Sequence, residues 1–140
     1  MRGEVPMKGH ARQLMTPNDV VVSPETTLAK AARELARVEI SGLPVSDSEG
    51  RVVGIVTESD LLGALLGTSP NNTAVQALMT SNIVTVDEFT PADHVLQLLR
   101  EHRIHYLPVV RQGVVVGLIT PQSVIQYFVT HELPSPPEAA

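Results

Sequence analysis

The sequence contains no cysteine and few aromatic residues, and both absences limit what the protein can be. Without cysteine there can be no disulfide bond, no thiolate nucleophile and no cysteine ligand for a metal. Aromatic residues make up 3% of the 140 residues, so a hydrophobic core must be built from valine, leucine, isoleucine and alanine. A chain of this length can bury roughly two thirds of its unfolded surface, which is enough for independent folding.

Basic clusters and long apolar runs are absent as well. The formal net charge is −5, and without a cluster of lysine and arginine residues we expect no binding to nucleic acid. The longest apolar run, residues 61–66, is too short to cross a bilayer, and the first ten residues lack the apolar centre of a secretion signal. We therefore expect a soluble, cytoplasmic protein that does not associate with membranes.

What the sequence does contain is an internal repeat that covers most of the chain. Three motifs recur in the same order in both halves, shifted by 64 residues and later by 63: Leu-Met-Thr at 14–16 and 78–80, Leu-Pro-Val at 43–45 and 107–109, and GIVTESDLL at 54–62, which becomes GLITPQSVI at 117–125. Matches in one order along both halves predict two structural repeats that are built in the same way.

Each half predicts the same order of secondary structure, β-α-β-β-α. Apolar residues at spacings of three and four predict amphipathic helices that begin at Leu28 and Ala92. Tight turns at Gly50 and Gly113, where glycine supplies a positive φ, join the last two strands of each half. The expected strands span 20–22, 43–45 and 52–56 in the first half and 83–86, 107–109 and 114–119 in the second, and the closing helices span 59–66 and 122–130. Because about 50 residues are too few for an independent core, we expect the two sheets to pack face to face around one shared core.

The order Leu-Met-Thr, helix, Ile-x-x-Leu-Pro-Val, then glycine, two apolar residues and Thr-x-x-Asp resembles the CBS domain. Two copies in tandem resemble the CBS pair, or Bateman module, and this implies an α+β fold with two domains related by a pseudo-two-fold axis. The implied organisation is an N-terminal segment at 1–10, CBS domain 1 at 11–67, a linker at 68–77, CBS domain 2 at 78–131, and a proline-rich, disordered tail at 132–140. Since little of the chain lies outside the two domains, we expect a stand-alone CBS pair.

A ligand site is suggested by residues 57–60, Thr-Glu-Ser-Asp, where a strand ends and a helix begins. Free backbone N–H groups favour an anion there, and a carboxylate can accept hydrogen bonds from both hydroxyls of a ribose. The same spacing equally predicts a helix cap, with Thr57 as the N-cap and Asp60 in the first turn. The family resemblance implies that Thr57 and Asp60 line an adenosine-nucleotide site, and the two roles can coexist. The resemblance also implies an adenine pocket formed by Thr16, Val20, Val22, Ile40, Ser41, Gly42 and Pro44.

In the second half, Ser123 stands where the first half has Asp60. A serine hydroxyl cannot hold two ribose hydroxyls as a carboxylate does, and Thr120 followed by proline is typical of a helix start. Thr120 is still a candidate ribose or phosphate contact, but we expect at most one strongly bound nucleotide per chain. The resemblance further implies that basic residues ahead of the second Leu-Pro-Val strand reach a phosphate, and Arg103 and His105 are the candidates.

The sequence offers no support for a metal site or for catalysis. His102 and His105 are three residues apart, but the helix is expected to end near His102, and no cysteine or acidic cluster completes a ligand set. No motif places a nucleophile next to a general base. We therefore expect neither a bound metal nor an enzymatic activity.

Two functions remain open from the sequence. The first is a regulatory module that binds AMP, ADP, ATP or S-adenosylmethionine in the cleft between the repeats and relays this binding to a regulated protein. The second is a ligand-free dimerisation or interaction module, in which the apolar segments at 61–67 and 74–78 pack between chains. A homodimer is expected under both.

Overall fold

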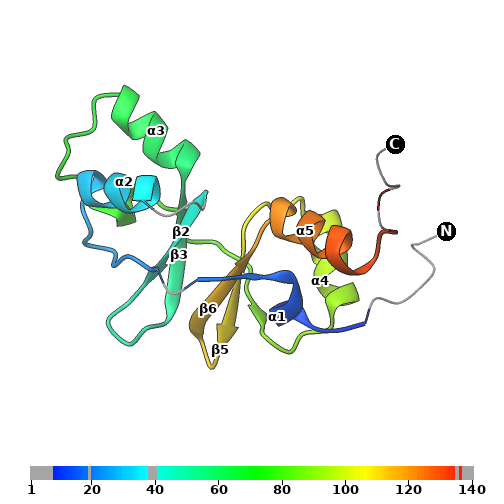
Figure 1. Cartoon of the computed structure of the whole chain (residues 1–140). Helices are drawn as coiled ribbons and strands as arrows, with labels where there is room; N and C mark the ends of the chain where they lie inside the picture. Colours follow the sequence, from blue (N-terminus) through cyan, green and yellow to red (C-terminus); the bar gives the residue numbers. More distant parts are fainter. Residues whose placement is uncertain (1–7, 19, 38–40, 135, 137–140) are drawn as a thin grey trace.

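The computed structural model describes residues 8–18, 20–37, 41–134 and 136. It consists of two α+β halves that lie side by side (Figure 1), as the repeat predicts. The elements, in chain order, are α1 (Ala11–Leu14), β1 (Thr16–Pro17), α2 (Leu28–Arg37), β2 (Gly42–Ser46), β3 (Val52–Thr57), α3 (Glu58–Leu66), the 3-10 helix η2 (Val75–Ala77), β4 (Val86–Asp87), α4 (Ala92–His102), β5 (Leu107–Arg111), β6 (Val114–Ile119) and α5 (Pro121–His131).

Most of these elements agree with the pattern read from the sequence. Helices α2 and α4 begin at Leu28 and Ala92, and the hairpins β2–β3 and β5–β6 pair in antiparallel registers. The turn glycines have positive φ, 83° at Gly50 and 84° at Gly113, as predicted. The structure adds α1 and β1, which the sequence did not predict, and η2 lies where a helix was expected to begin at the end of the linker.

The first strand of each half is shorter than predicted. In the first half Val22 forms only an isolated parallel bridge with Val45, and in the second half β4 holds two residues, Val86 and Asp87. The missing residues lie at the start of each predicted strand, and in the first half the Val20 N–H donates to the Oδ1 of Asn18 at 2.8 Å instead of to a neighbouring strand. A turn then ends the pairing in both halves. The carbonyl of Ser23 accepts a hydrogen bond from Thr26 at 3.0 Å, and the carbonyl of Asp87 accepts one from Thr90 at 3.0 Å, so the chain leaves the sheet there.

The segment that precedes each half pairs with a strand of the other half. Strand β1 lies antiparallel to β6, with Thr16 opposite Leu118. In the equivalent place, Thr80 forms an antiparallel bridge with Ile55 in β3, and two backbone hydrogen bonds of 2.9 Å join these residues. The two halves are therefore crossed at their N-terminal segments.

The short helices are exchanged between the halves in the same way, because each one packs against the half that it does not precede in the sequence. Helix α1 packs against α4 and α5 of the second half (Figure 1), and the Ala11 N–H donates to the Thr90 carbonyl at 2.8 Å. Likewise η2 lies against the first half, where the Val75 N–H donates to the Thr26 carbonyl at 2.8 Å. Each half is thus completed by a helix that stands before the other half in the sequence.

This exchange gives two hydrophobic cores, so the prediction of one shared core was wrong. The first core contains Val22, Leu28, Ala31, Leu43, Val45, Val56, Leu61, Ala64 and Val75. The second contains Ala11, Leu14, Val86, Ala92, Val95, Leu107, Val109 and Ile119. Each half can have a core of its own because the exchanged helix, through Val75 or through Ala11 and Leu14, covers apolar side chains that the half alone would leave exposed.

Two glycines permit the crossing. A Cβ atom on Gly54 would lie 2.6 Å from the Sδ of Met79 and 2.8 Å from the carbonyl oxygen of Thr80. A Cβ atom on Gly117 would overlap the side chain of Met15 in the same way. Because no such contact is tolerated below 3.0 Å, only glycine lets the exchanged segment lie this close to the strand. The repeated methionines and glycines of the sequence therefore fit each other across the two halves.

Replacing Gly54 with alanine should destabilise the fold by about 1–3 kcal/mol, because the added methyl group forces Met79 and the Thr80 backbone to move. The control is Gly63→Ala in α3, where an added Cβ meets nothing within 4 Å, and which should raise stability by up to about 1 kcal/mol. Urea unfolding followed by circular dichroism measures both changes. Equal stability of Gly54→Ala and the parent chain would contradict the packing described here.

Candidate functional site

A cavity of about 610 Å³ opens between the two halves. Its polar lining comes from Ser41 and Glu58 in the first half, from Thr120, Gln122 and Ser123 in the second, and from Thr16 in β1. Leu35 of α2 and Leu118 of β6 supply apolar surface. The volume falls within the range of roughly 300–1,000 Å³ that is usual for small-molecule sites. A ligand in this cavity would contact both repeats.

The corner between β6 and α5 forms one wall of the cavity and is a complete helix cap. The Thr120 Oγ1 accepts a hydrogen bond from the Ser123 N–H at 3.1 Å. In return the Ser123 Oγ accepts from the Thr120 N–H at 2.9 Å and donates to the Thr120 carbonyl at 3.0 Å. The capping role predicted for Thr120 is confirmed. The hydroxyl hydrogen of Ser123 is occupied by this cap, so Ser123 can offer a ligand only an acceptor.

The corner between β3 and α3 is capped in the same way. The Oδ2 atom of Asp60 accepts from the Thr57 N–H at 2.8 Å and from the Thr57 hydroxyl at 3.0 Å, and the Asp60 N–H donates to the Thr57 Oγ1 at 3.3 Å. The predicted cap is confirmed here too. These bonds engage only one carboxylate oxygen, so Oδ1 can still accept from a ligand. Neither residue lines the 610 Å³ cavity, and their role as ribose contacts stays a prediction.

The residues predicted to form an adenine pocket do not all lie together. Thr16 and Ser41 line the cavity. Val22 is only 6% exposed and belongs to the first core, against which Val20 also packs. Pro44 is buried in β2, and its carbonyl accepts a hydrogen bond from the Val22 N–H at 3.0 Å. Ile40 lies outside the described residues.

Gly42, another residue of the predicted adenine pocket, lies close to an aromatic ring of the chain itself. A Cβ atom on Gly42 would lie 3.3 Å from the Cδ1 of Tyr106. Gly42 is in the first half and Tyr106 precedes β5 in the second, so this contact joins the two halves. Its role toward an adenine ring stays a prediction.

The exchanged segments change which residues share a cleft. Thr16 pairs with Leu118, two residues before Thr120, and so belongs with the second helix cap. Thr80 pairs with Ile55, two residues before Thr57, and takes the equivalent place beside the first cap. Sequence reasoning grouped Thr16 with Thr57 and missed Thr80, because a repeat shows which segments are equivalent but does not show on which half each one packs.

Arg103 and His105 are both exposed on the chain between α4 and β5, and neither lines the 610 Å³ cavity. Arg103 ends α4 in a left-handed conformation, with φ 50° and ψ 43°, directly after His102. In the described part of the chain, no group of three or more histidine, aspartate and glutamate side chains is arranged to hold a metal ion. Within the same ranges, no helix has both the length and the apolar character needed to cross a bilayer.

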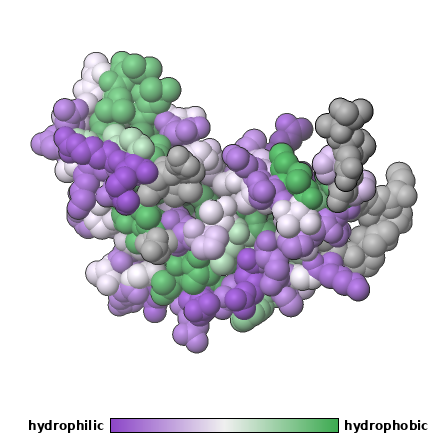
Figure 2. Space-filling view, viewed as in Figure 1, coloured by the Kyte–Doolittle hydropathy of each residue, from purple (hydrophilic) through white to green (hydrophobic). Residues whose placement is uncertain are grey.

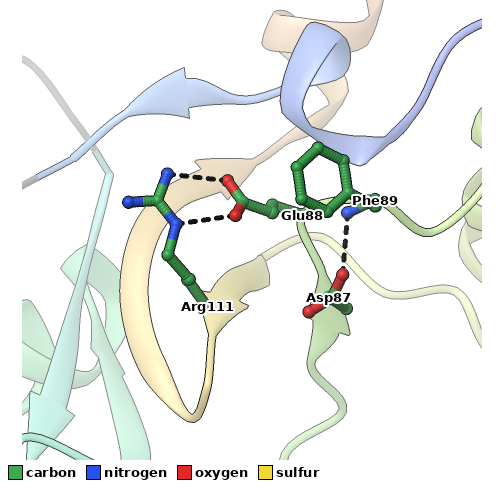
Figure 3. A network of polar contacts seen from close by, with 4 residues as sticks. All are labelled: Asp87, Glu88, Phe89 and Arg111. Carbon is green, nitrogen blue, oxygen red and sulfur yellow. Dashed lines mark hydrogen bonds and ion pairs between the residues drawn. The ribbon is translucent and has the colours of Figure 1, made fainter.

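A buried carboxylate with a displaced pKa lies in the second half (Figure 3). Glu88 is 3% exposed, and Arg111 donates to it through two hydrogen bonds, Nε to Oε1 at 2.6 Å and Nη2 to Oε2 at 2.9 Å. These bonds hold the pKa of Glu88 below its ordinary value, against the effect of burial, and the charges of Arg111 and Arg12 act in the same direction. The hydrogen bonds to Glu88, and its charge, raise the pKa of Arg111.

A displaced pKa can mark a functional group, but this pair has a structural role. Neither residue lines the cavity, and both oxygens of Glu88 are occupied by the arginine. The Glu88 N–H also donates to the Val110 carbonyl at 3.0 Å, so the pair fixes the chain after β4 to strand β5. In the first half, the repeat places Pro24 and Asp47 at these positions, so the ion pair has no counterpart there.

The model of the CBS domain family matches residues 11–67 and 75–130. The chain therefore belongs to the CBS-domain family and carries two such domains in tandem. Inosine-5′-monophosphate dehydrogenase of Mycobacterium tuberculosis is 34% identical over 119 residues, which make up 84% of this chain but 22% of that enzyme. The chain thus spans less than a quarter of the length of this relative.

Solved structures show the same architecture. The crystal structure of CBSX2 in complex with AMP is 29% identical and superposes with a TM-score of 0.75, over 87% of this chain and 97% of that one. The CBS domain pair of protein MJ0100, in complex with 5′-methylthioadenosine and S-adenosyl-L-methionine, is 28% identical with a TM-score of 0.75 and the same coverage. The predicted CBS-pair fold is confirmed.

The Glu88–Arg111 pair predicts how stability depends on pH. Since the pKa of Glu88 is lowered in the folded state, its contribution is fully present above its ordinary pKa near 4.5 and is lost as the pH falls through the folded value. Glu88→Gln should therefore be less stable than the parent at pH 7, and the difference should shrink below pH 4.5. The control is Glu49→Gln, at an exposed ion pair with Arg51, where little change is expected. Melting temperatures at several pH values measure this, and a difference that stays constant down to pH 3 would contradict it.

Proposed function

We propose that this chain is a regulatory module that binds an adenosine-containing molecule between its two CBS domains. The observation that carries the proposal is the 610 Å³ cavity, whose walls come from both domains. Its volume suits a nucleoside, and its neutral hydroxyl and amide groups suit the sugar and the base. Two similar structures support this choice, because CBSX2 was crystallised with AMP and the MJ0100 pair with two adenosine derivatives.

A second cleft is proposed beside the cap of Thr57 and Asp60. While Oδ2 of Asp60 holds the helix cap, its Oδ1 can accept hydrogen bonds from ribose hydroxyls. Arg103 and His105 are exposed on the segment before β5 and could reach the phosphate of the same ligand. This arrangement would take AMP, ADP or ATP, with the sugar held by one domain and the phosphate by the other.

Regulation would follow from the shared walls. A ligand that contacts both domains changes the free energy of their relative arrangement by the difference in its affinity for the two arrangements. A regulated protein could then read that change. The side chains of Thr57 and Asp60 at one corner, and of Thr120 and Ser123 at the other, are engaged in helix caps, so the proposed activity is binding and not catalysis.

An interaction surface is a second candidate function, favoured by exposed apolar residues on two helices. On α3, Leu62 and Leu66 are 56% and 79% exposed, and on α5 Ile125 and Val129 are 62% and 57% exposed. The repeat makes these equivalent positions, and an apolar patch is visible over α3 (Figure 2). Burial of large apolar side chains favours association, so we propose that these helices form the interface of a homodimer.

The ligand proposal predicts that calorimetry detects binding of AMP, ADP, ATP or S-adenosylmethionine. Asp60→Asn should weaken binding of AMP about tenfold or more, because an amide keeps the helix cap but loses the charged acceptor for the ribose. Asp47→Asn is the matched control. Asp47 likewise accepts backbone hydrogen bonds, from Glu49 at 2.9 Å and Arg51 at 3.0 Å, but lies in a turn. If none of the four compounds binds the parent chain, the proposal is overturned and the interaction function gains.

The dimer proposal predicts that Leu66→Asp raises the dimer dissociation constant at least about tenfold. Burial of one leucine is worth about 1.5–3 kcal/mol, and a charge at the same place would have to be desolvated. The control is Val21→Asp, at an apolar residue that is 42% exposed outside α3 and α5. Sedimentation equilibrium measures both. A parent chain that stays monomeric at high concentration would contradict the proposal.

A further inference from the structure

The 610 Å³ cavity carries charge of one sign only. Among its described lining residues, Glu58 is the one charged side chain, and the other polar ones are neutral hydroxyls and amides. Glu58 is exposed and is the first residue of α3. Its N–H donates to the carbonyl of Ser41 at 2.9 Å, which fixes the start of α3 at the edge of the cavity. The described lining therefore presents a carboxylate and no cation to a ligand.

The start of α5, which also lines the cavity, offers little to an anion. A helix N-terminus that binds phosphate does so through free backbone N–H groups. At the start of α5, however, Pro121 has no N–H, and the N–H groups of Thr120 and Ser123 are both taken by the cap. Among the backbone N–H groups of residues 120–123, that of Gln122 is the one left available to a ligand. A phosphate in this cavity would be repelled by the carboxylate of Glu58, and too few free backbone N–H groups are left at the start of α5 to offset that repulsion.

The cleft related to this cavity by the repeat has the opposite character. The equivalence is supported by the matching contacts of Thr16 with Leu118 and of Thr80 with Ile55, and by the two matching caps. The repeat gives the equivalents of three lining residues in the other cleft. Arg100 is equivalent to Ala36 and His105 to Ser41. Pro121 is equivalent to Glu58. Two basic side chains thus replace neutral ones, Glu58 has no charged equivalent, and Asp60 stands where the cavity has Ser123.

We infer that the two clefts select ligands by charge, and that the cavity beside Ser123 takes an adenosine derivative without a phosphate. Glu58 supplies from the first domain the carboxylate that Ser123 lacks in the second, and it excludes phosphorylated nucleotides by repulsion. The cleft beside Asp60 takes the phosphorylated nucleotide, and the repeat adds Arg100 to Arg103 and His105 as basic residues near its phosphate. This inference rests on the proposed function and adds the ligand class for each cleft.

Adenosine and AMP test this directly, because they differ only in the phosphate. Calorimetry should show two adenosine molecules but one AMP bound per parent chain. Glu58→Lys should admit a second AMP, with affinity in that cleft raised about tenfold or more, since a like charge becomes an opposite one in a partly exposed site. Glu49→Lys, an equal change of charge in an exposed turn, should bind like the parent chain.

A double variant tests the other cleft. Arg100→Gln with His105→Gln should lose at least about tenfold in affinity for AMP and keep its affinity for adenosine. Circular dichroism and thermal unfolding confirm that each variant is folded. Two AMP molecules bound equally by the parent chain, or an AMP stoichiometry that Glu58→Lys leaves unchanged, would overturn the inference and leave the proposed function standing. Failure of both adenosine and AMP to bind the parent chain would overturn both.

Discussion

The packing of Met79 on Gly54, and of Met15 on Gly117, is the contact on which the rest of the molecule depends. A side chain at either glycine would push the exchanged segment away from the strand. Because the segments cross, each hydrophobic core includes residues that precede the other half in the sequence, such as Val75 and Leu14. Neither half could leave the other without exposing that core, so the pair behaves as one folding unit made of two small ones.

The same crossing builds the clefts. Strand β1 brings Thr16 beside Leu118, and so beside the cap of Thr120 and Ser123, while Ser41 and Glu58 approach from the first half. Three hydrogen bonds in each cap fix the strand-to-helix corner, so a ligand meets preorganised polar groups. A site assembled from both domains is also the arrangement that lets a bound molecule alter how the domains are packed.

Features that depend on neighbouring residues could be predicted from the sequence, and features that depend on distant pairing could not. The caps at Thr57 and Thr120 and the turn at Gly50 are set by residues at most three positions apart, and they were predicted. The segment exchange and the Glu88–Arg111 pair, whose members are 23 residues apart, needed the structure. Val22 was predicted to line the adenine pocket, but it is buried in the first core. The sequence shows that this residue is apolar but does not show which face of the strand it lies on. The sequence alone shows that Ser123 replaces Asp60. It does not show that the carboxylate of Glu58 lines the same cavity as Ser123, which only the structure reveals.

The central claim is that an adenosine compound binds between the two domains. A titration of ¹⁵N-labelled protein with adenosine, followed by two-dimensional NMR, tests it most directly because every backbone amide except those of the prolines reports separately. The expected result is that the amide signals of Thr16, Ser41, Thr120, Gln122 and Ser123 shift together and saturate with one common dissociation constant. If these signals stay in place, or if the shifts are confined to the outer faces of α3 and α5, then the cavity is not the binding site.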